Sequence, residues 1–162
     1  MQSAEEVVAF MRRHGLVLAT AESCTSGLIA SQLADISGAG ACLDRAFVTY
    51  TVQAKIDLLG VNRRTIDQFN LTSEAVAKEM ARGALAASHA NVAISNTGVV
   101  DDSDPSVPAG TQCLAWAFNI RGTVTVYSER CRFLGDRRAM REACARYALA
   151  QLPAYYRRLS NP

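Results

Sequence analysis

The sequence predicts an α/β fold, a three-layer α/β/α sandwich with a mixed β-sheet. Three observations predict it: short apolar runs that suit buried strands alternate with segments of helical periodicity, two longer β-rich runs follow each other as a hairpin, and a capped helix closes the chain. The length of 162 residues and the 49% share of hydrophobic residues fit one domain, residues 1–162, with a sizeable core.

Polar caps and apolar residues at helical spacing mark the predicted helices. The first helix follows Ser3, has acidic residues in its first turn and ends before Gly15. Asp136 is the expected cap of the last helix, and Pro153 is expected to end it, because proline lacks the N–H that continues a helix. The predicted helices cover residues 3–13, 28–33, 53–59, 65–69, 72–88 and 137–152.

Strands are predicted where β-branched or apolar residues run together between turn residues. The last two, with Arg121 and Gly122 between them, should form an antiparallel hairpin. The predicted strands cover residues 16–20, 46–51, 92–95, 111–119 and 122–133. In a sheet of this kind a ligand is expected at the carboxyl ends of the first strands.

The segment from Glu22 to Gly27 is expected to be a sharp turn between the first strand and the second helix. Ser23, Thr25 and Ser26 lie on it, next to a helix N-terminus whose free N–H groups favour an anion or a developing oxyanion. Such a turn is a suitable place for the nucleophile of an enzyme. The alternative is that these hydroxyl groups only cap the helix.

Several separated motifs, in a fixed order, resemble those of a known family. They are AESCTSG at 21–27, FVTYTVQAK at 47–55, Thr97-Gly98, PAGT at 108–111 and Gly135-Asp136-Arg137. On these motifs the chain resembles the CinA C-terminal domain family along nearly its whole length. The characterised enzymes of that family are nicotinamide-nucleotide amidohydrolases (PncC), and the family's fold agrees with the sandwich predicted above.

The resemblance implies hydrolysis of the carboxamide of nicotinamide mononucleotide to nicotinate mononucleotide and ammonia, without a metal or a cofactor. It makes Ser23 the nucleophile, Lys55 its base, and Tyr50 a group that passes or orients the proton. A lysine can take the proton of a serine once burial or a nearby cation lowers its pKa, while N–H groups of the turn hold the oxyanion. Without the resemblance, Lys55 is equally well interpreted as a solvated helix lysine.

Substrate binding is assigned to residues of the same motifs: Thr25, Ser26, Gly27, Thr97 and Gly98. Arg137 and Arg141, at the start of the last helix, complete the set. If the turn before them points into the cleft, either guanidinium can bind a carboxylate or phosphate through two hydrogen bonds. The alternative is that this basic cluster is a solvated face of the helix.

The chain departs from the family in its motifs. Ser26 replaces a usual glycine, which would allow a positive φ, and Thr51-Val52 replaces a usual Ser-Asn. The loop after Gly98 has aspartates at 101, 102 and 104 in place of the family's glycines, and these would repel a phosphate. Other interpretations of this loop are a mobile solvated segment or a weak cation site. A second hypothesis follows: an altered or inactive family member that serves as a binding or regulatory protein, or acts on a different small amide.

The five cysteines have no C-x-x-C spacing, which favours reduced, structural thiols. Cys24 has an alternative role, because a thiol near a helix N-terminus can have a lowered pKa and be the nucleophile in place of Ser23. Neither His14 nor His89 has partners at metal-ligand spacing, so no metal site is expected.

The composition excludes several classes of partner. A net charge of +2 gives no electrostatic case for nucleic acid, and there is no apolar run of ~18 residues, so no membrane association is expected. We expect a cytoplasmic protein whose partner is a small-molecule substrate, a pyridine nucleotide or related amide. Alanine-rich and aromatic helix surfaces, including Tyr155 and Tyr156, suit a homodimer or higher homo-oligomer.

Overall fold

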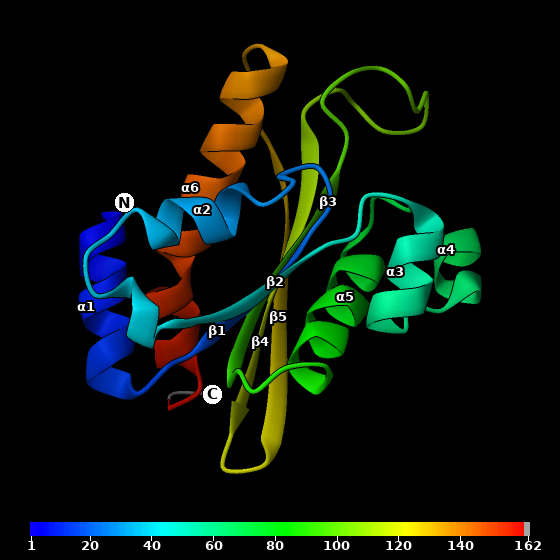
Figure 1. The fold of residues 1–162 in the computed structure, drawn as a ribbon. Helices are drawn as coiled ribbons and strands as arrows, with labels where there is room; N and C mark the ends of the chain where they lie inside the picture. The colour runs from blue at the N-terminus through cyan, green and yellow to red at the C-terminus, as the bar shows by residue number, and fades with distance from the viewer. Residues whose placement is uncertain (161–162) are drawn as a thin grey trace.

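The computed structural model describes residues 1–160 and contains one five-stranded sheet with helices on both faces (Figure 1). The strand order is β2-β1-β3-β4-β5. β1 pairs in parallel with β2 and β3, whereas β4 is antiparallel to β3 and β5. The predicted mixed sheet is therefore confirmed. The strands are β1 (Leu18–Glu22), β2 (Leu43–Val48), β3 (Val92–Gly98), β4 (Thr111–Ile120) and β5 (Thr123–Arg132).

Two groups of helices form the outer layers of the sandwich. Figure 1 shows α1, α2 and α6 on one side of the sheet and α3, α4 and α5 on the other. The predicted three-layer α/β/α architecture is confirmed. The helices are α1 (Ala4–His14), α2 (Leu28–Ala34), the 3₁₀ turn η1 (Ala39–Ala41), α3 (Val52–Leu59), α4 (Arg63–Phe69), α5 (Glu74–Ala86) and α6 (Arg137–Arg158).

Each face of the sheet has its own core. The face under α1, α2 and α6 is packed with large side chains, including Trp116 and Phe118, which are fully buried. The face under α5 is built mainly from alanines and smaller apolar residues. Small side chains let α5 lie close to the sheet, and Gly83 lets it approach the end of α3, because a Cβ at this position would collide with the backbone of Leu59. The position of α3, which carries Lys55, therefore depends on this close contact.

Several predicted boundaries are wrong; the first strand ends at Glu22 and the third at Gly98, and two further differences have a local cause. The second strand ends at Val48 rather than at residue 51, because Thr51 caps α3 by accepting a hydrogen bond from the backbone N–H of Ala54. The last helix does not end at Pro153 but continues to Arg158. An interior proline costs a helix about 3 kcal/mol. Beyond it, however, Tyr155 is buried and stacks on Trp116 with the ring centroids 4.4 Å apart. We attribute the longer helix to this packing.

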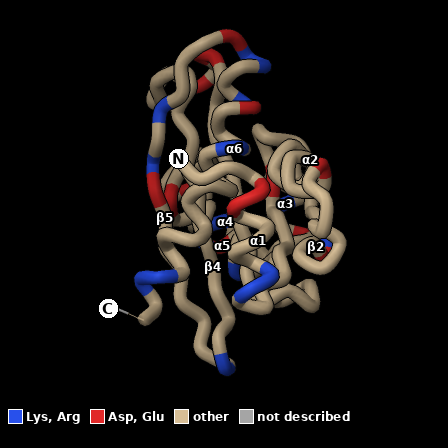
Figure 2. Tube along the Cα trace, turned by 90° about the vertical axis from the view of Figure 1, so that its left-hand side faces the viewer, with Lys and Arg blue, Asp and Glu red and all other residues tan. Residues whose placement is uncertain are grey.

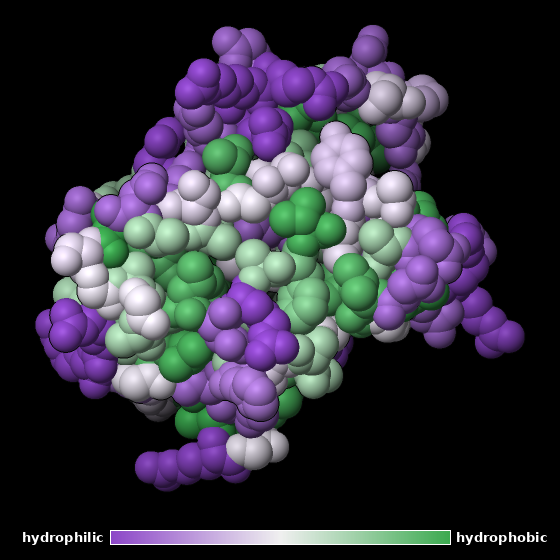
Figure 3. All heavy atoms as spheres, viewed as in Figure 1, coloured by the Kyte–Doolittle hydropathy of each residue, from purple (hydrophilic) through white to green (hydrophobic). Residues whose placement is uncertain are grey.

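The same packing corrects the expected dimer surface. Tyr155 is 3% exposed in the single chain, so it belongs to the core and is not an oligomer contact. Its neighbour Tyr156 is partly buried and packs edge-on against Phe10 of α1. On the face viewed in Figure 3, hydrophilic residues gather at the end where α6 begins, and apolar residues lie across the middle. Among residues 1–160, no helix is long and apolar enough to cross a membrane.

Candidate active site

The turn after β1 is fixed to the neighbouring strand β3. The backbone N–H of Ser23 donates to the carbonyl of Asn96, at 3.1 Å, and the backbone N–H of Thr25 donates to Oδ1 of the same residue, at 3.0 Å. β1 ends at Glu22, so Ser23 is the first residue beyond the strand. The residue is 8% exposed and lines a pocket. Ser23 thus lies where the sequence predicts it, on the turn between a buried strand and the helix that follows.

Lys55 contacts Ser23 from α3, the helix that follows the neighbouring strand β2. Its Nζ donates to Oγ of Ser23 at 2.9 Å, to the carbonyl of Thr49 at 2.6 Å and to the carbonyl of Tyr50 at 3.2 Å. An ammonium group has three N–H donors, so these three acceptors use all of them. The lone pair that a base needs becomes available only when this nitrogen loses its proton.

Burial alters the acidity of this lysine. Lys55 lies on the first turn of α3, and none of its surface is exposed. The interpretation as a solvated helix lysine is therefore excluded. Burial disfavours the charged form and lowers the pKa of Lys55 from 10.5 to about 8. A substantial fraction of the amine is therefore neutral near physiological pH, which suits a general base.

The carboxylate of Glu22 accepts hydrogen bonds from the N-terminus of α2. Its Oε1 accepts the backbone N–H groups of Gly27 and Ile29, at 3.1 and 2.9 Å, and its Oε2 accepts the N–H of Ala30, at 3.1 Å. Oε2 also accepts the hydroxyl of Thr20, at 2.8 Å. The first donors of the helix, which sequence reasoning left free for a ligand, are thus satisfied by a carboxylate of the protein itself.

One N–H of the turn is left for an oxyanion. The backbone N–H groups of Ser23, Thr25, Ser26 and Leu28 donate within the protein. Among residues 1–160, no acceptor contacts the backbone N–H of Cys24. Cys24 directly follows Ser23 and lines the same pocket. The expected oxyanion donors therefore reduce to this single turn N–H. Burial also raises the pKa of the Cys24 thiol, which disfavours the alternative nucleophile.

A pocket of about 210 Å³ opens in front of Ser23. It lies between the turn after β1, Tyr50, Leu71, the end of β3 with the loop that follows, and the first residue of α6. Four other predicted residues line it: Tyr50, Thr97, Gly98 and Arg137. The structure thus brings most of the predicted site into one place, although the segments are far apart in the sequence.

Tyr50 contacts Lys55 through its backbone rather than its ring. Its side chain is 60% exposed, and no hydrogen bond of its hydroxyl is found within residues 1–160. The role of this hydroxyl as a proton carrier stays a prediction.

The remaining predicted binding residues lie outside the pocket. The side chain of Thr25 is fully buried, the N–H of Gly27 is bound to Glu22, and Ser26 is exposed. Arg141 binds the backbone of the turn: its Nε donates to the carbonyl of Cys24 at 2.7 Å, and its Nη2 donates to the carbonyl of Thr25 at 3.3 Å. These contacts hold the turn in shape. Binding of substrate by these four residues stays a prediction.

Arg137 is paired with the acidic loop. Its Nη2 donates to Oδ2 of Asp101 at 2.7 Å, and both residues line the pocket. Hydrogen bonds from Ser103, together with the nearby guanidinium, lower the pKa of Asp101. The loop therefore presents a carboxylate, and the Arg137 side chain already has an anion as its partner.

Comparisons with known proteins give the family of the chain. A family model described as the CinA C-terminal domain matches residues 1–156. The chain belongs to this family. It is 40% identical over 154 residues to the nicotinamide-nucleotide amidohydrolase PncC of Shigella flexneri, a match that covers 94% of this chain and 92% of that protein. It is 37% identical over 161 residues to a CinA-like protein of Chlorobium limicola, of which it spans only 38%.

Solved structures of the CinA family have the same fold. The chain is 39% identical to the competence/damage inducible protein CihA of Agrobacterium tumefaciens, with a TM-score of 0.86 over 93% of this chain and 92% of that one. A CinA superfamily protein of Escherichia coli is 36% identical, with a TM-score of 0.82 over 93% of this chain and 88% of that one.

The departure from the family at position 26 has a structural counterpart. Ser26 has a φ of 49°, in the left-handed region that favours glycine. The turn thus keeps the backbone conformation that the family's usual glycine permits, although a serine occupies it.

Three residues of the site were not predicted. Besides Glu22, the pair Asn96 and Gln112 joins the turn to the sheet. The Nδ2 of Asn96 donates to Oε1 of Gln112 at 2.7 Å, and the Nε2 of Gln112 donates to the carbonyl of Val99 at 3.0 Å. Both side chains are buried. The signal in the sequence is weak: one amide residue near the end of β3 and one near the start of β4.

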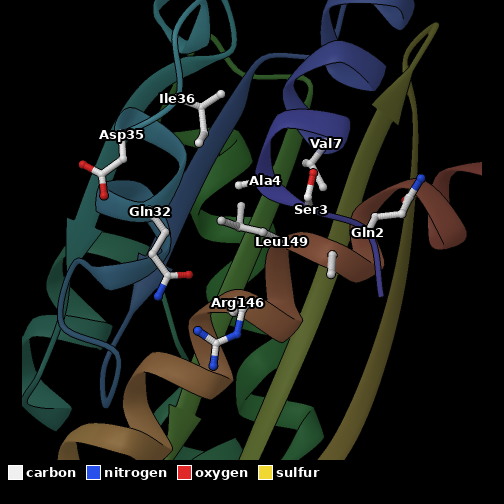
Figure 4. Close-up of a pocket in the computed structure, with 10 residues that line it drawn as sticks. Gln2, Ser3, Ala4, Val7, Gln32, Asp35, Ile36, Arg146 and Leu149 are labelled. Carbon is white, nitrogen blue, oxygen red and sulfur yellow. The ribbon is translucent and has the colours of Figure 1, made fainter.

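A second pocket, of about 320 Å³, lies between α1, α2 and α6 (Figure 4). Its floor is apolar, with Val7, Ile36 and Leu149, and its polar residues include Asp35 and Arg146. None of the reactive residues lines it, and its Ser3 is the cap of α1. The smaller pocket, which contains Ser23, is therefore the candidate active site. Over the described part of the chain, no group of three or more His, Cys, Asp or Glu residues is arranged to hold a metal.

Proposed function

We propose that this protein is an amidohydrolase in which Ser23 attacks a primary carboxamide and Lys55 is its base. The proposed substrate is nicotinamide mononucleotide or a related pyridine carboxamide. The observation that carries the proposal is the 2.9 Å contact between Lys55 Nζ and Ser23 Oγ, made by a lysine with no exposed surface. Relatives at 40% identity are named nicotinamide-nucleotide amidohydrolases, which supports both the amide class and the nucleotide.

In the first half of the reaction, neutral Lys55 takes the proton of the Ser23 hydroxyl as Oγ bonds to the amide carbon. The carbonyl oxygen gains the negative charge, and we assign its stabilisation to the backbone N–H of Cys24, a pocket-lining residue whose N–H has no acceptor within residues 1–160. Lys55 then gives its proton to the amide nitrogen, the C–N bond breaks, and ammonia leaves. The product of this half is an ester on Ser23.

In the second half, a water molecule takes the place of ammonia. Lys55 removes a proton from the water as its oxygen bonds to the ester carbon, and returns that proton to Ser23 Oγ when the ester bond breaks. The carboxylic acid leaves and ionises. The two carbonyl acceptors of Lys55, on Thr49 and Tyr50, hold the amine in place through both halves.

The direct test is ammonia release from nicotinamide mononucleotide by wild type, Ser23→Ala and Lys55→Met. Methionine fills a volume similar to that of lysine but cannot take a proton. General base catalysis contributes about 10²–10⁴-fold, so we expect Lys55→Met to lose at least that factor and Ser23→Ala to lose nearly all activity. Glu5→Gln, at an exposed position of α1, serves as the control. Equal rates in all four proteins contradict the proposal.

A second candidate function is favoured by one observation, the Asp101–Arg137 pair at the pocket. Within residues 1–160, Arg137 is the one lysine or arginine that lines the pocket, and it is already paired. Such a family member is also suited to bind a pyridine compound without turnover, as a regulatory protein. Stabilisation of the protein by nicotinamide mononucleotide, with no release of ammonia over many hours, would favour this candidate. We further propose that the protein acts in the cytoplasm as a homodimer or higher homo-oligomer. Sedimentation of the purified protein tests the proposed assembly.

A further inference from the structure

The candidate active site contains an ion pair between residues of two different segments, both of which line the pocket. Asp101 lies on the loop after β3, and Arg137 is the first residue of α6. They meet at 2.7 Å, and both line the pocket that contains Ser23. Figure 2 shows acidic and basic positions mixed at this end of the molecule.

Arg137 is the cation that a phosphate in this pocket would need. Among the pocket-lining residues, which all lie within residues 1–160, it is the only lysine or arginine. Arg141 is bound to two carbonyl groups of the turn, and Lys55 lies behind Ser23 with its three N–H groups engaged. A guanidinium holds a phosphate best when two of its N–H groups are free.

Asp101 is held in its position by the loop. The backbone N–H of Ser103 donates to its Oδ1 at 3.1 Å, opposite the oxygen that accepts Arg137. On either side, the side chains of Val100 and Val107 are buried and anchor the loop. Further along, Asn70 donates to Oδ2 of Asp104 at 2.9 Å. The carboxylate is thus preorganised, and a ligand has to compete with it for Arg137.

The competition depends on the charge of the ligand. A nucleotide phosphate carries about −1.5 to −2 charges at neutral pH, and it would have to displace Asp101 and then remain beside that carboxylate. A pyridine carboxamide linked to ribose without a phosphate carries one positive charge on its ring and has no such conflict. An uncharged amide has none either.

We propose that Asp101 is a specificity-determining residue that occupies the anion-binding group of Arg137, so that the pocket prefers pyridine carboxamides without a phosphate over their phosphorylated forms. This inference rests on the proposed amidohydrolase function for its substrate class. The catalytic pair is not involved in the discrimination, because neither Asp101 nor Arg137 contacts Ser23 or Lys55 through a hydrogen bond.

The test compares Asp101→Asn with Asp102→Asn. Both changes remove one negative charge from the same loop, but Asp102 is exposed, does not line the pocket and has no ion pair with Arg137. For each protein, kcat/KM is measured on nicotinamide mononucleotide and on nicotinamide riboside. We expect the ratio of the two values to rise about tenfold in Asp101→Asn, in favour of the mononucleotide, and to stay within about twofold in Asp102→Asn. Addition of Arg137→Gln to Asp101→Asn should abolish the gain.

Equal ratios in wild type and Asp101→Asn, or equal increases in both single variants, would overturn the inference. A binding measurement separates this failure from failure of the proposed function. Calorimetry with nicotinate mononucleotide and nicotinate riboside needs no turnover, and Asp101→Asn should tighten binding of the mononucleotide alone. If no amide is hydrolysed and this tightening occurs, the proposed function fails and the role of Asp101 holds. If amides are hydrolysed and binding is unchanged, the role of Asp101 fails.

Discussion

The carboxylate of Glu22 accepts the backbone N–H of Ile29 at 2.9 Å, so the residue directly before the candidate nucleophile also caps the helix that follows it. One side chain therefore determines both the start of α2 and the path of the turn that carries Ser23. The anion at this helix N-terminus is therefore the Glu22 carboxylate of the protein itself, and these N–H groups are not available to a substrate.

Glu22→Gln tests this arrangement. The amide keeps one oxygen acceptor but turns an NH₂ group toward N–H donors, so we expect a loss of about 1–3 kcal/mol in the free energy of unfolding. The turn should also shift, which lowers kcat more than it changes KM. Urea unfolding and steady-state kinetics measure the two effects. Glu5→Gln, at an exposed position of α1, is the control. A Glu22 variant as stable and active as this one contradicts the role.

The pH dependence of activity should follow Lys55. Its pKa is lowered to about 8, and only the neutral amine is a base. We therefore expect kcat/KM to rise as the pH rises toward about 8 and to level off above it. A profile that is flat between pH values of about 6 and 9, or that falls in this range, contradicts the assignment.

The same lowered pKa predicts a stability effect with a defined sign. Below about pH 8 the folded protein buries the cation, whereas the unfolded chain keeps its amine charged up to about pH 10.4. The loss of folding stability caused by the buried charge is therefore largest below pH 8, and it disappears as the pH rises from about 8 to about 10.4. Relative to Lys55→Met, the wild type should gain stability between these pH values, as measured by chemical unfolding at each pH. A constant difference between the two proteins would argue against a buried, perturbed amine.

Ser26→Gly should stabilise the protein slightly. Serine at a φ of 49° is strained, and glycine is not, so we expect a gain of about 0.5–1 kcal/mol at this position. Ser31→Gly, in the interior of α2, is the matched control and should lose a similar amount, because glycine weakens a helix. Thermal unfolding of the two variants should shift in opposite directions, with activity retained in Ser26→Gly.

Gly83→Ala should damage both stability and activity. The added methyl group would collide with the backbone of Leu59, which cannot move without shifting α3 and Lys55 with it. Overpacking of this kind costs about 1–3 kcal/mol. Gly40→Ala is the control, because no heavy atom lies within 4 Å of the added Cβ. Full activity at low temperature in Gly83→Ala would show that the approach of α5 to α3 is not needed to place the base.

The layers and most elements could be predicted, because local patterns specify them. The pairing of Ser23 with Lys55 is expected only from the family resemblance, because no local pattern brings residues from two strand ends together. The network of Asn96 and Gln112 could not, because it depends on the register of β3 against β4, which no local pattern specifies. The continuation of α6 past Pro153 depends on tertiary stacking of Tyr155, which overrides the local preference of proline. The pairing of Asp101 with Arg137 likewise joins a loop and a helix that are distant in sequence.

The place of β2 at the outer edge of the sheet has a consequence for refolding experiments. Ser23 follows β1 and Lys55 follows β2, so the reactive pair exists only in molecules whose edge strand has docked in the correct register. Trp116 lies on the far side of β3, in β4, and its fluorescence reports formation of the interior instead. Recovery of turnover after dilution from denaturant would thus time the arrival of the edge strand, separately from collapse of the core.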